Sequence, residues 1–222
     1  MNSKSEPGSR ARMVEAAITL MRGSGLSGAG INEIVRVSGA PKGSVYHFFP
    51  QGKLQITTEA LAVYSTRVVA FIDQALASEN QPGARVSALF SAFARRVEQG
   101  DFHQSCAVGT VSLDLDGDLQ ALQDVLGRTF SEWTALIAAH FDLGDNDRTR
   151  SFASLVLTAI EGAYVRARAE RSARPFKEAG EWLAMLADQQ NRVSGQSLDE
   201  HCRAYPDGEK AGCLHSAGAA PC

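Results

Sequence analysis

The chain has 222 residues, of which 44% are hydrophobic and 21% are charged, and this balance is typical of an ordinary globular protein with one or two domains. No apolar run approaches the length that a bilayer requires, and the N-terminus lacks a hydrophobic signal region. We therefore expect a soluble, cytoplasmic protein with no membrane partner. Three of the four cysteines follow residue 200, which is not the spacing of a disulfide-stapled secreted fold.

The charge is divided unevenly along the chain. Residues 1–55 carry seven Lys and Arg against three Asp and Glu, a net charge of +4. Residues 56–222 carry 15 against 22, a net charge of −7, and the overall value of −3 conceals the difference. A basic N-terminal segment on an acidic body is typical of a local module that contacts phosphates.

The predicted elements begin after a polar arm, residues 1–9. Ser9 is a candidate N-cap for a first helix that runs to about Arg22, with apolar residues at helical spacing, until a Gly-Ser-Gly segment ends it. Two short helical patterns follow, over residues 31–38 and 41–48. Gly39 stands between them where a helix commonly ends in a left-handed residue, and Pro41 fits the first turn of the second helix.

The second short pattern has one apolar face and one polar face. Val45, Phe48 and Phe49 are predicted to be buried. The outer face and the N-terminal end carry Lys42, Gly43, Ser44, Tyr46 and His47. Two short helices joined by a tight turn are the helix-turn-helix arrangement, whose second helix enters the DNA major groove. These side-chain types can contact phosphates and base edges, so the segment predicts DNA binding.

Helical spacing predicts five further helices, over residues 53–78, 84–99, 119–141, 147–171 and 175–190, and a short apolar segment covers 106–115. Leu54 opens the apolar stripe of the first of these helices. No segment alternates like a strand, so we expect an all-α protein of about nine helices. From residue 191 large apolar residues become rare, which predicts a disordered tail. The expected domains are 1–52 for DNA binding, 53–190 for regulation and dimerisation, and the tail 191–222.

The segment 31–53 resembles the DNA-binding domain of the TetR-type transcriptional repressors, through Ile34-Val35, Ser38-Gly39, Lys42-Gly43-Ser44, Tyr46-His47-Phe48 and Lys53. The run GAPKGSVYHFFPQGK is similar, more narrowly, to the subgroup related to LmrA and YxaF. The resemblance implies that double-stranded operator DNA is contacted by Gly30, Lys42, Gly43, Ser44, Tyr46, His47 and Lys53. Two residues depart from the family pattern: Pro41 replaces a Ser or Thr, and Gly30 replaces a Thr that caps the preceding helix. Both remain compatible with the fold.

The resemblance also implies an effector cavity among the central helices and a homodimer formed by the last two helices, 147–171 and 175–190. The candidate effector-binding residues are Phe93, Cys106, Phe130, Trp133, Glu161 and Tyr164, with Glu161 as the polar anchor. Each aromatic residue alone is better explained as ordinary core. Cys106 lies in Cys-Ala-Val-Gly, which resembles the subgroup's Gly-Cys-Pro-x-Gly. It is either a buried structural thiol or a pocket-lining or redox-sensing residue.

Three other kinds of site are disfavoured by spacing. Asp114, Asp116 and Asp118 suggest a calcium loop, but Leu119 and Val125 stand where such a loop needs Gly and Glu. Zinc-ligand types near the C-terminus lack paired spacing: His201, Cys202, Cys213, His215 and Cys222. The sequence contains no nucleotide-binding loop and no nucleophile motif. We expect no metal, no cofactor and no catalytic residue.

These observations lead to one functional hypothesis and one alternative. The hypothesis is a homodimeric, ligand-responsive repressor that leaves its operator when a small, largely apolar molecule binds. The alternative is a dimeric helical interaction module that has lost or altered its DNA binding.

Overall fold

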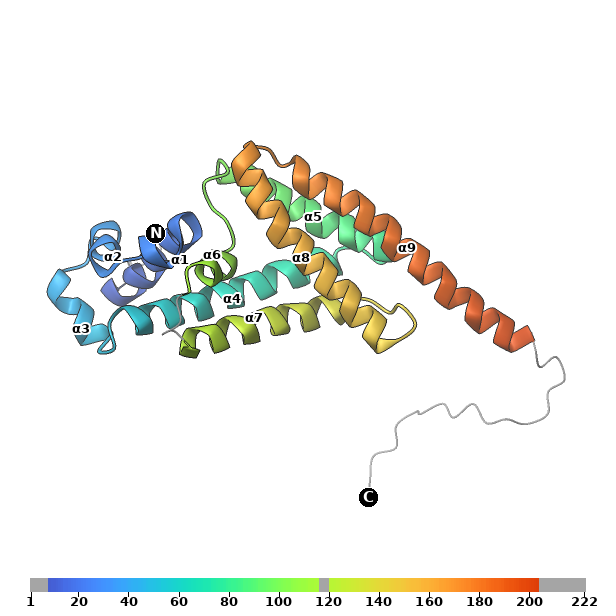
Figure 1. The fold of residues 1–222 in the computed structure, drawn as a ribbon, viewed down its shortest axis with the longest axis horizontal. Coiled ribbons are helices and arrows are strands. Elements are labelled where there is room, and N and C mark those ends of the chain that lie inside the picture. The colour runs from blue at the N-terminus through green and yellow to red at the C-terminus, as the bar shows by residue number, and fades with distance from the viewer. Residues whose placement is uncertain (1–7, 116–119, 204–222) are drawn as a thin grey trace, which may run out of the picture.

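In the computed structural model the described residues are 8–115 and 120–203, and every regular element among them is helical (Figure 1). In chain order the elements are α1 (Ser9–Gly28), α2 (Ile31–Ser38), the 3₁₀ helix η1 (Lys42–Ser44), α3 (Val45–Phe48), α4 (Lys53–Ala77), α5 (Pro82–Gln99), α6 (Ala107–Leu113), α7 (Gln120–Ala138), α8 (Asn146–Glu170) and α9 (Arg174–Arg203). The prediction of an all-α fold is confirmed.

The first helix is longer than predicted. Gly25 has non-helical angles, φ 69° and ψ −167°, so the expected break occurs, but one further turn follows it as far as Gly28. Gly8, rather than Ser9, is the N-cap. The continuation beyond the break is possible because α6 packs against α1 there and supplies hydrogen-bond partners.

The last helix also exceeds its prediction. α9 runs to Arg203 instead of ending near Gln190, so the first part of the predicted tail is helical. No proline lies between Pro175 and Pro206, so nothing in that segment removes a backbone donor from the helical ladder. The remainder of the predicted tail, 204–222, lies outside the described residues.

The helices form a small head joined to a larger body (Figure 1). α1, α2 and α3 make up the head at one end of the molecule, and α4 runs from the head into the body beside α7. α4 packs against α1 in the head and against α5 and α7 in the body. α6 lies between the two parts, with contacts to α1, α4 and α7.

α4 owes its apolar composition to this position. By length and composition alone it could cross a membrane, with a mean hydropathy of 1.2 in its most apolar stretch, which corrects our expectation that no segment reaches that length. One face of the helix is buried within the helical bundle, and its large side chains are Ile56, Leu61, Tyr64, Val68, Ile72 and Leu76. The composition is therefore that of a core helix. Leu54, predicted to open the buried stripe, is 39% exposed, and Ile56 takes its place.

Two glycines allow α5 and α9 to approach closely. The amide nitrogen of Gly83 donates to Oδ1 of Asp188 at 2.8 Å, so a side chain of α9 caps the first turn of α5. A Cβ atom added to Gly180 would lie 2.7 Å from Cβ of Phe90, closer than such atoms pack. The absence of a side chain at Gly180 is therefore required by the packing of these helices.

We predict that Gly180→Ala lowers the free energy of unfolding by about 1–3 kcal/mol, because Phe90 can move away only by displacing α5. The matched control is Gly127→Ala in α7, where an added Cβ meets no atom within 4 Å. That substitution raises the free energy of unfolding by roughly 0.5–1 kcal/mol, the ordinary helical preference for Ala over Gly. Denaturant unfolding of both variants measures the difference, and equal stabilisation by both would contradict the tight packing at Gly180.

Candidate nucleic-acid interface and interior polar cluster

The turn between α2 and α3 is built from local backbone preferences. α2 starts after Gly30, an N-cap that provides no side-chain hydrogen bond, and ends at Gly39 in the left-handed conformation (φ 62°, ψ 16°), as predicted. The second helix differs from the prediction, since it begins as η1 and becomes α-helical only at Val45. The amide and the hydroxyl of Ser44 both donate to the carbonyl of Pro41, at 3.0 and 2.6 Å. Such i→i+3 bonding tightens the turn into a 3₁₀ helix.

Buried side chains fix this short helix to the rest of the head. Val45 and Phe49 are fully buried and Phe48 is partly buried, as the apolar pattern predicts. The Arg10 guanidinium lies 5.2 Å from the centre of the Phe49 ring. Nε of Arg12 donates to the carbonyl of Ser38 at 3.0 Å, which ties α1 to the end of α2.

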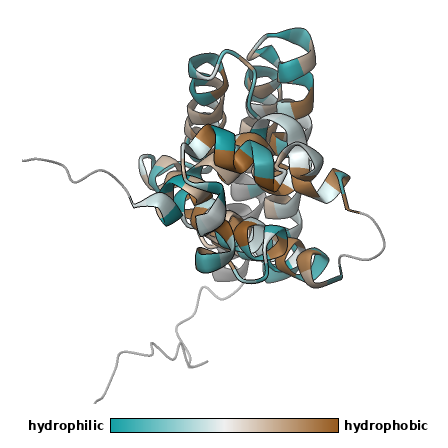
Figure 2. Ribbon diagram, turned by 90° about the vertical axis from the view of Figure 1, so that its left-hand side faces the viewer, coloured by the Kyte–Doolittle hydropathy of each residue, from teal (hydrophilic) through white to brown (hydrophobic). Residues whose placement is uncertain are grey.

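The predicted DNA-contact residues gather at this end of the molecule. Lys42, Gly43, Tyr46 and His47 are exposed, and Gly30, Ser44 and Lys53 are partly exposed, the last at the start of α4. The Tyr46 ring lies next to Gly52, because a Cβ atom added there would be 3.5 Å from Cε1 of the tyrosine. The tyrosine is thus close to the start of α4. Figure 2 views the molecule from this end, where hydrophilic and hydrophobic positions alternate along the short helices.

Gly43 has no packing reason to be glycine. A Cβ atom added to it would meet nothing within 4 Å, and its backbone is not in the left-handed region. The missing side chain leaves open space on the exposed surface beside Lys42. Such space suits the close approach of another molecule to the backbone.

The aromatic effector candidates form two groups of rings in the body. Phe93 contacts Tyr164 with ring centres 5.8 Å apart, and both contact Phe176. Phe130 contacts Trp133 at 5.9 Å, and Nε1 of that tryptophan donates to the Ser65 hydroxyl at 3.0 Å. Tyr64, which the sequence analysis did not select, lies 6.4 Å from the Trp133 ring.

Cys106 and Glu161 meet where α6 approaches α8. Cys106 is buried and caps α6, with its Sγ accepting from the Gly109 amide at 3.5 Å. A Cβ atom added to Gly109 would lie 2.4 Å from Oε2 of Glu161, so the carboxylate sits directly against α6. Burial raises the pKa of Glu161 to about 7, and a hydrogen bond from the Cys106 thiol partly opposes that rise.

The surroundings of Cys106 favour a structural thiol over a reactive one. Burial raises its pKa well above the ordinary value, and the neighbouring Glu161 charge raises it further. The thiolate, which is the reactive form, is therefore disfavoured.

Tyr64, Cys106, Glu161 and Tyr164 form an interior cluster of polar groups, and two arginines that were not predicted join it. Arg22 lies over the Tyr64 ring at 5.7 Å and Arg96 over the Phe71 ring at 4.9 Å. Burial raises the pKa of Tyr164 above its usual range, and these two cations oppose the rise. The arginines come from α1 and α5, so only the tertiary structure brings both of them close to Tyr164.

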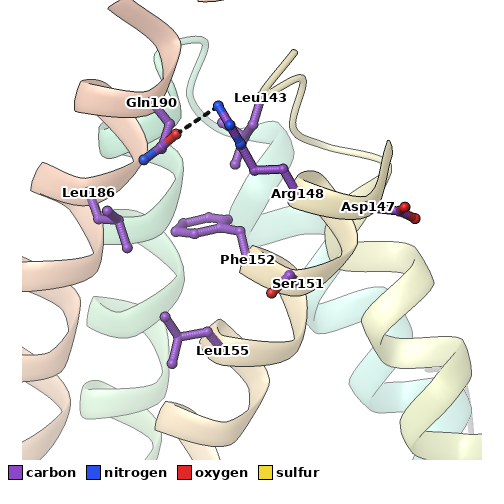
Figure 3. Close-up of a pocket in the computed structure, with 8 residues that line it drawn as sticks. All are labelled: Leu143, Asp147, Arg148, Ser151, Phe152, Leu155, Leu186 and Gln190. Atoms are coloured by element: carbon purple, nitrogen blue, oxygen red, sulfur yellow. Dashed lines mark hydrogen bonds between the residues drawn. The ribbon is translucent and has the colours of Figure 1, made fainter. Parts of the chain in front are cut away.

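Three open cavities are lined by described residues. One, of about 620 Å³, is lined by Phe130 together with Thr134 and Arg150. A second, of about 570 Å³, lies between α8 and α9, with Phe152, Leu155 and Leu186 around it (Figure 3). The third, of about 410 Å³, lies between α4 and α7. Of the six predicted effector residues, only Phe130 lines one of these three cavities.

The position of Glu161 predicts a pH-dependent stability. Its pKa is raised from 4.5 to about 7, so its contribution to stability is fully present below pH 4.5 and is lost as the pH rises through 7. Glu161→Gln removes the ionisation, and above pH 7 the variant should exceed the wild type in free energy of unfolding by about 1–3 kcal/mol. Denaturant unfolding at pH 5 and pH 8 measures the free energy of unfolding of the wild type and of the variant.

The matched control for this experiment is Glu132→Gln, on the exposed face of α7. It should leave the pH profile unchanged. Parallel profiles for the wild type and Glu161→Gln would contradict the burial of this carboxylate.

Comparison with known proteins identifies the family. Residues 82–182 match the family described as "Transcriptional regulator LmrA/YxaF-like, C-terminal domain". The uncharacterized HTH-type transcriptional regulator Rv0196 of Mycobacterium tuberculosis is 32% identical over 178 residues, which cover 76% of this chain and 89% of that protein. The uncharacterized HTH-type transcriptional regulator YxaF of Bacillus subtilis is 26% identical, covering 80% of this chain and 94% of that protein.

A solved structure agrees in fold. The TetR family transcriptional regulator CifR, a cysteine mutant complexed with 26-bp double-strand operator DNA, superposes with a TM-score of 0.71 at 17% identity. The match covers 82% of this chain and 98% of that one. These relatives are transcriptional regulators and not enzymes. The chain belongs to the TetR family of transcriptional regulators, in its LmrA/YxaF-like branch.

Proposed function

We propose that this regulator is a ligand-responsive repressor, which binds operator DNA as a homodimer and leaves it when a small, largely apolar molecule binds in the body. The proposal rests on one observation about η1 and α3. Four residues there are exposed, and the opposite face of the same short helix is buried; the four are Lys42, Gly43, Tyr46 and His47. We expect this regulator to act on DNA in the cytoplasm.

The proposed DNA contacts divide by chemistry. Lys42 and Lys53 neutralise phosphates, while Tyr46 and His47 offer hydrogen bonds to phosphates or base edges. Gly43 and Gly30, where added Cβ atoms would meet no neighbour, allow the backbone to approach the duplex. The N-terminus of α2, after Gly30, adds amide donors that favour phosphate. In a dimer, two such heads face successive major grooves of a palindromic operator.

Exposed apolar side chains support dimerisation through α8 and α9. Leu155 and Val165 on α8 are 47% and 62% exposed, and Trp182 and Met185 on α9 are 72% and 53% exposed. Side chains of this size cluster on a monomer surface mainly where another molecule covers them. A Cβ atom added to Gly162, on the same face of α8, would meet no atom within 4 Å, which leaves room for a partner helix.

The interior cluster supports a site for the effector. The Phe93 and Tyr164 rings provide an apolar surface, and the buried Glu161 carboxylate, whose charge acts on Tyr164, provides one polar anchor, as in small-molecule sites. These side chains pack together in the present conformation, so the effector binds by selecting a conformation in which they separate. By linkage, the effector then lowers DNA affinity by the same factor by which DNA lowers effector affinity.

Binding to the chain's own upstream DNA across a salt series tests the repressor proposal. We expect a specific complex whose affinity falls steeply with salt. Lys42→Ala and Lys53→Ala should each weaken binding and reduce the slope of log affinity against log salt by about 1. Lys177→Ala, an exposed lysine on α9, is the matched control and should change neither quantity. An absence of salt-dependent binding to any duplex would favour the alternative, an interaction module without DNA binding.

The proposed dimer interface makes a separate prediction. Trp182→Glu should weaken self-association by about 2–4 kcal/mol, because it places a charge where a large exposed ring meets the partner. Leu113→Glu is the matched control: that leucine is 82% exposed but lies on α6. Sedimentation velocity should find more monomer for the first variant and wild-type association for the second. Equal behaviour of the two variants would remove Trp182 from the interface.

A further inference from the structure

Most of the described cations of the head are engaged by partners within the protein. Each arginine before residue 40 donates a hydrogen bond to an oxygen of another residue: Arg10 to Glu59, Arg12 to Ser38, Arg22 to Ser105 and Arg36 to Glu33. Hydrogen bonds from Ser27 lower the pKa of Asp114, and the charge of Lys53 lowers it further, so Lys53 also has an acidic group nearby. These cations must share or give up a protein partner to serve DNA.

Lys42 is the exception within the described part of the head. Its side chain is exposed and makes no hydrogen bond, ion pair or ring contact with another described residue. It is also the first residue of η1, directly after the extended backbone of Pro41 (φ −61°, ψ 132°). In a helix-turn-helix, the N-terminal residues of the second helix lie against the base edges in the major groove. The unengaged ammonium group therefore stands where bases are read.

The neighbours of Lys42 leave room for such a contact. At Gly43 an added Cβ atom would meet no atom within 4 Å, so no side chain fills the surface beside the lysine. The Tyr46 ring lies next to Gly52, on the side of the head where α4 begins with Lys53. Tyr46 and Lys53 are thus placed together for a phosphate, which leaves the first turn of η1 to the bases.

The side chains of η1 and α3 include no amide and no carboxylate. Asn and Gln read adenine through a paired donor and acceptor, and Asp and Glu accept from the amino group of cytosine, but residues 42–48 contain none of the four. The Lys42 ammonium has three hydrogens to donate and cannot accept a hydrogen bond. A base that meets Lys42 must therefore present acceptors in the major groove.

Guanine is the base that fits this requirement best. In the major groove it exposes two acceptors side by side, N7 and O6. Adenine places the amino donor N6 beside N7, and cytosine exposes only its amino donor. Thymine offers a single acceptor, O4, beside a methyl group. An ammonium group can donate to both acceptors of guanine at once, and to no other base in this way.

We propose that Lys42 is a specificity-determining residue, which reads a guanine in each half-site of the operator by donating to its N7 and O6 atoms. The inference deepens the proposed function and rests on it, because it requires that the head binds DNA. The charge of Lys42 still contributes to the salt dependence in this position, since phosphates of both strands border the groove. The third hydrogen of the ammonium group remains for a phosphate or a water molecule.

Selection of duplexes from a randomised library by the full-length chain tests the assignment. We expect the wild type to enrich a two-fold symmetric site with a guanine at one fixed position of each half. Lys42→Arg should retain that guanine, because arginine bonds the same two acceptors, and Lys42→Gln should exchange it for adenine. Lys42→Ala should lose the preference at that position alone. Lys53→Ala, the matched control, should weaken binding to all sequences about equally and keep the guanine.

A chemical change in the selected DNA tests the contact itself. Replacing that guanine by 7-deazaguanine removes N7 and retains the base pair, so the wild-type affinity should fall at least about five-fold, the low end of what a bidentate contact provides. The same replacement should not change the affinity of Lys42→Ala, which has no ammonium group to donate.

Two results would overturn the proposal: equal losses for the two proteins on 7-deazaguanine, or a guanine preference that persists in Lys42→Ala. A wild type that enriches no duplex even at low salt would instead refute the proposed function, and this inference with it. The two failures are distinguishable, because only the first kind leaves a wild type that selects a specific duplex.

Discussion

The burial of α4 in both parts of the molecule is the constraint on which the rest of the structure depends. Its apolar residues pack against α1 at one end and against α5 and α7 over the remainder. Each large apolar side chain buried in this way stabilises the fold by about 1.5–3 kcal/mol, so the helix cannot separate from either part without a large cost. Relative motion of head and body must therefore occur by small shifts of whole helices, and contacts at the edges of α4 determine which shifts are allowed.

Most of the fold could be predicted because helical periodicity records which face of each helix is buried. The ends of helices were harder to predict. α1 continues past Gly25 because Asp114, 89 positions later, caps the added turn, and a partner so distant in sequence leaves no local signal. The left-handed end of α2 was predicted correctly, because Gly39 alone determines it.

The two candidate sites also differ in how far their residues could be predicted from the sequence. The exposed residues of the helix-turn-helix lie within one short segment, so motif and polarity together were sufficient to select them. The interior cluster is assembled from α1, α4, α5, α6 and α8. Arg22 and Arg96 could not be recognised, because an arginine above an aromatic ring looks like a surface residue in the sequence. Tyr64 could not be recognised either, because in the sequence it is one position of the apolar stripe of α4. Glu161 was selected from the sequence, but its contact with Cys106 depends on where the tertiary structure places α6 relative to α8.

Pro41 changes how the head can bind phosphate. Because proline has no amide hydrogen, the start of η1 offers one donor fewer than a Ser or Thr there would. The Ser44 hydroxyl donates its single hydrogen to the Pro41 carbonyl at 2.6 Å. In this conformation the hydroxyl can only accept hydrogen bonds, whereas a phosphate needs donors. Phosphate binding therefore depends on other donors, chiefly the ammonium groups of Lys42 and Lys53. A head that relies on point charges rather than hydroxyl geometry should bind DNA with strong dependence on salt and little dependence on the orientation of any one phosphate.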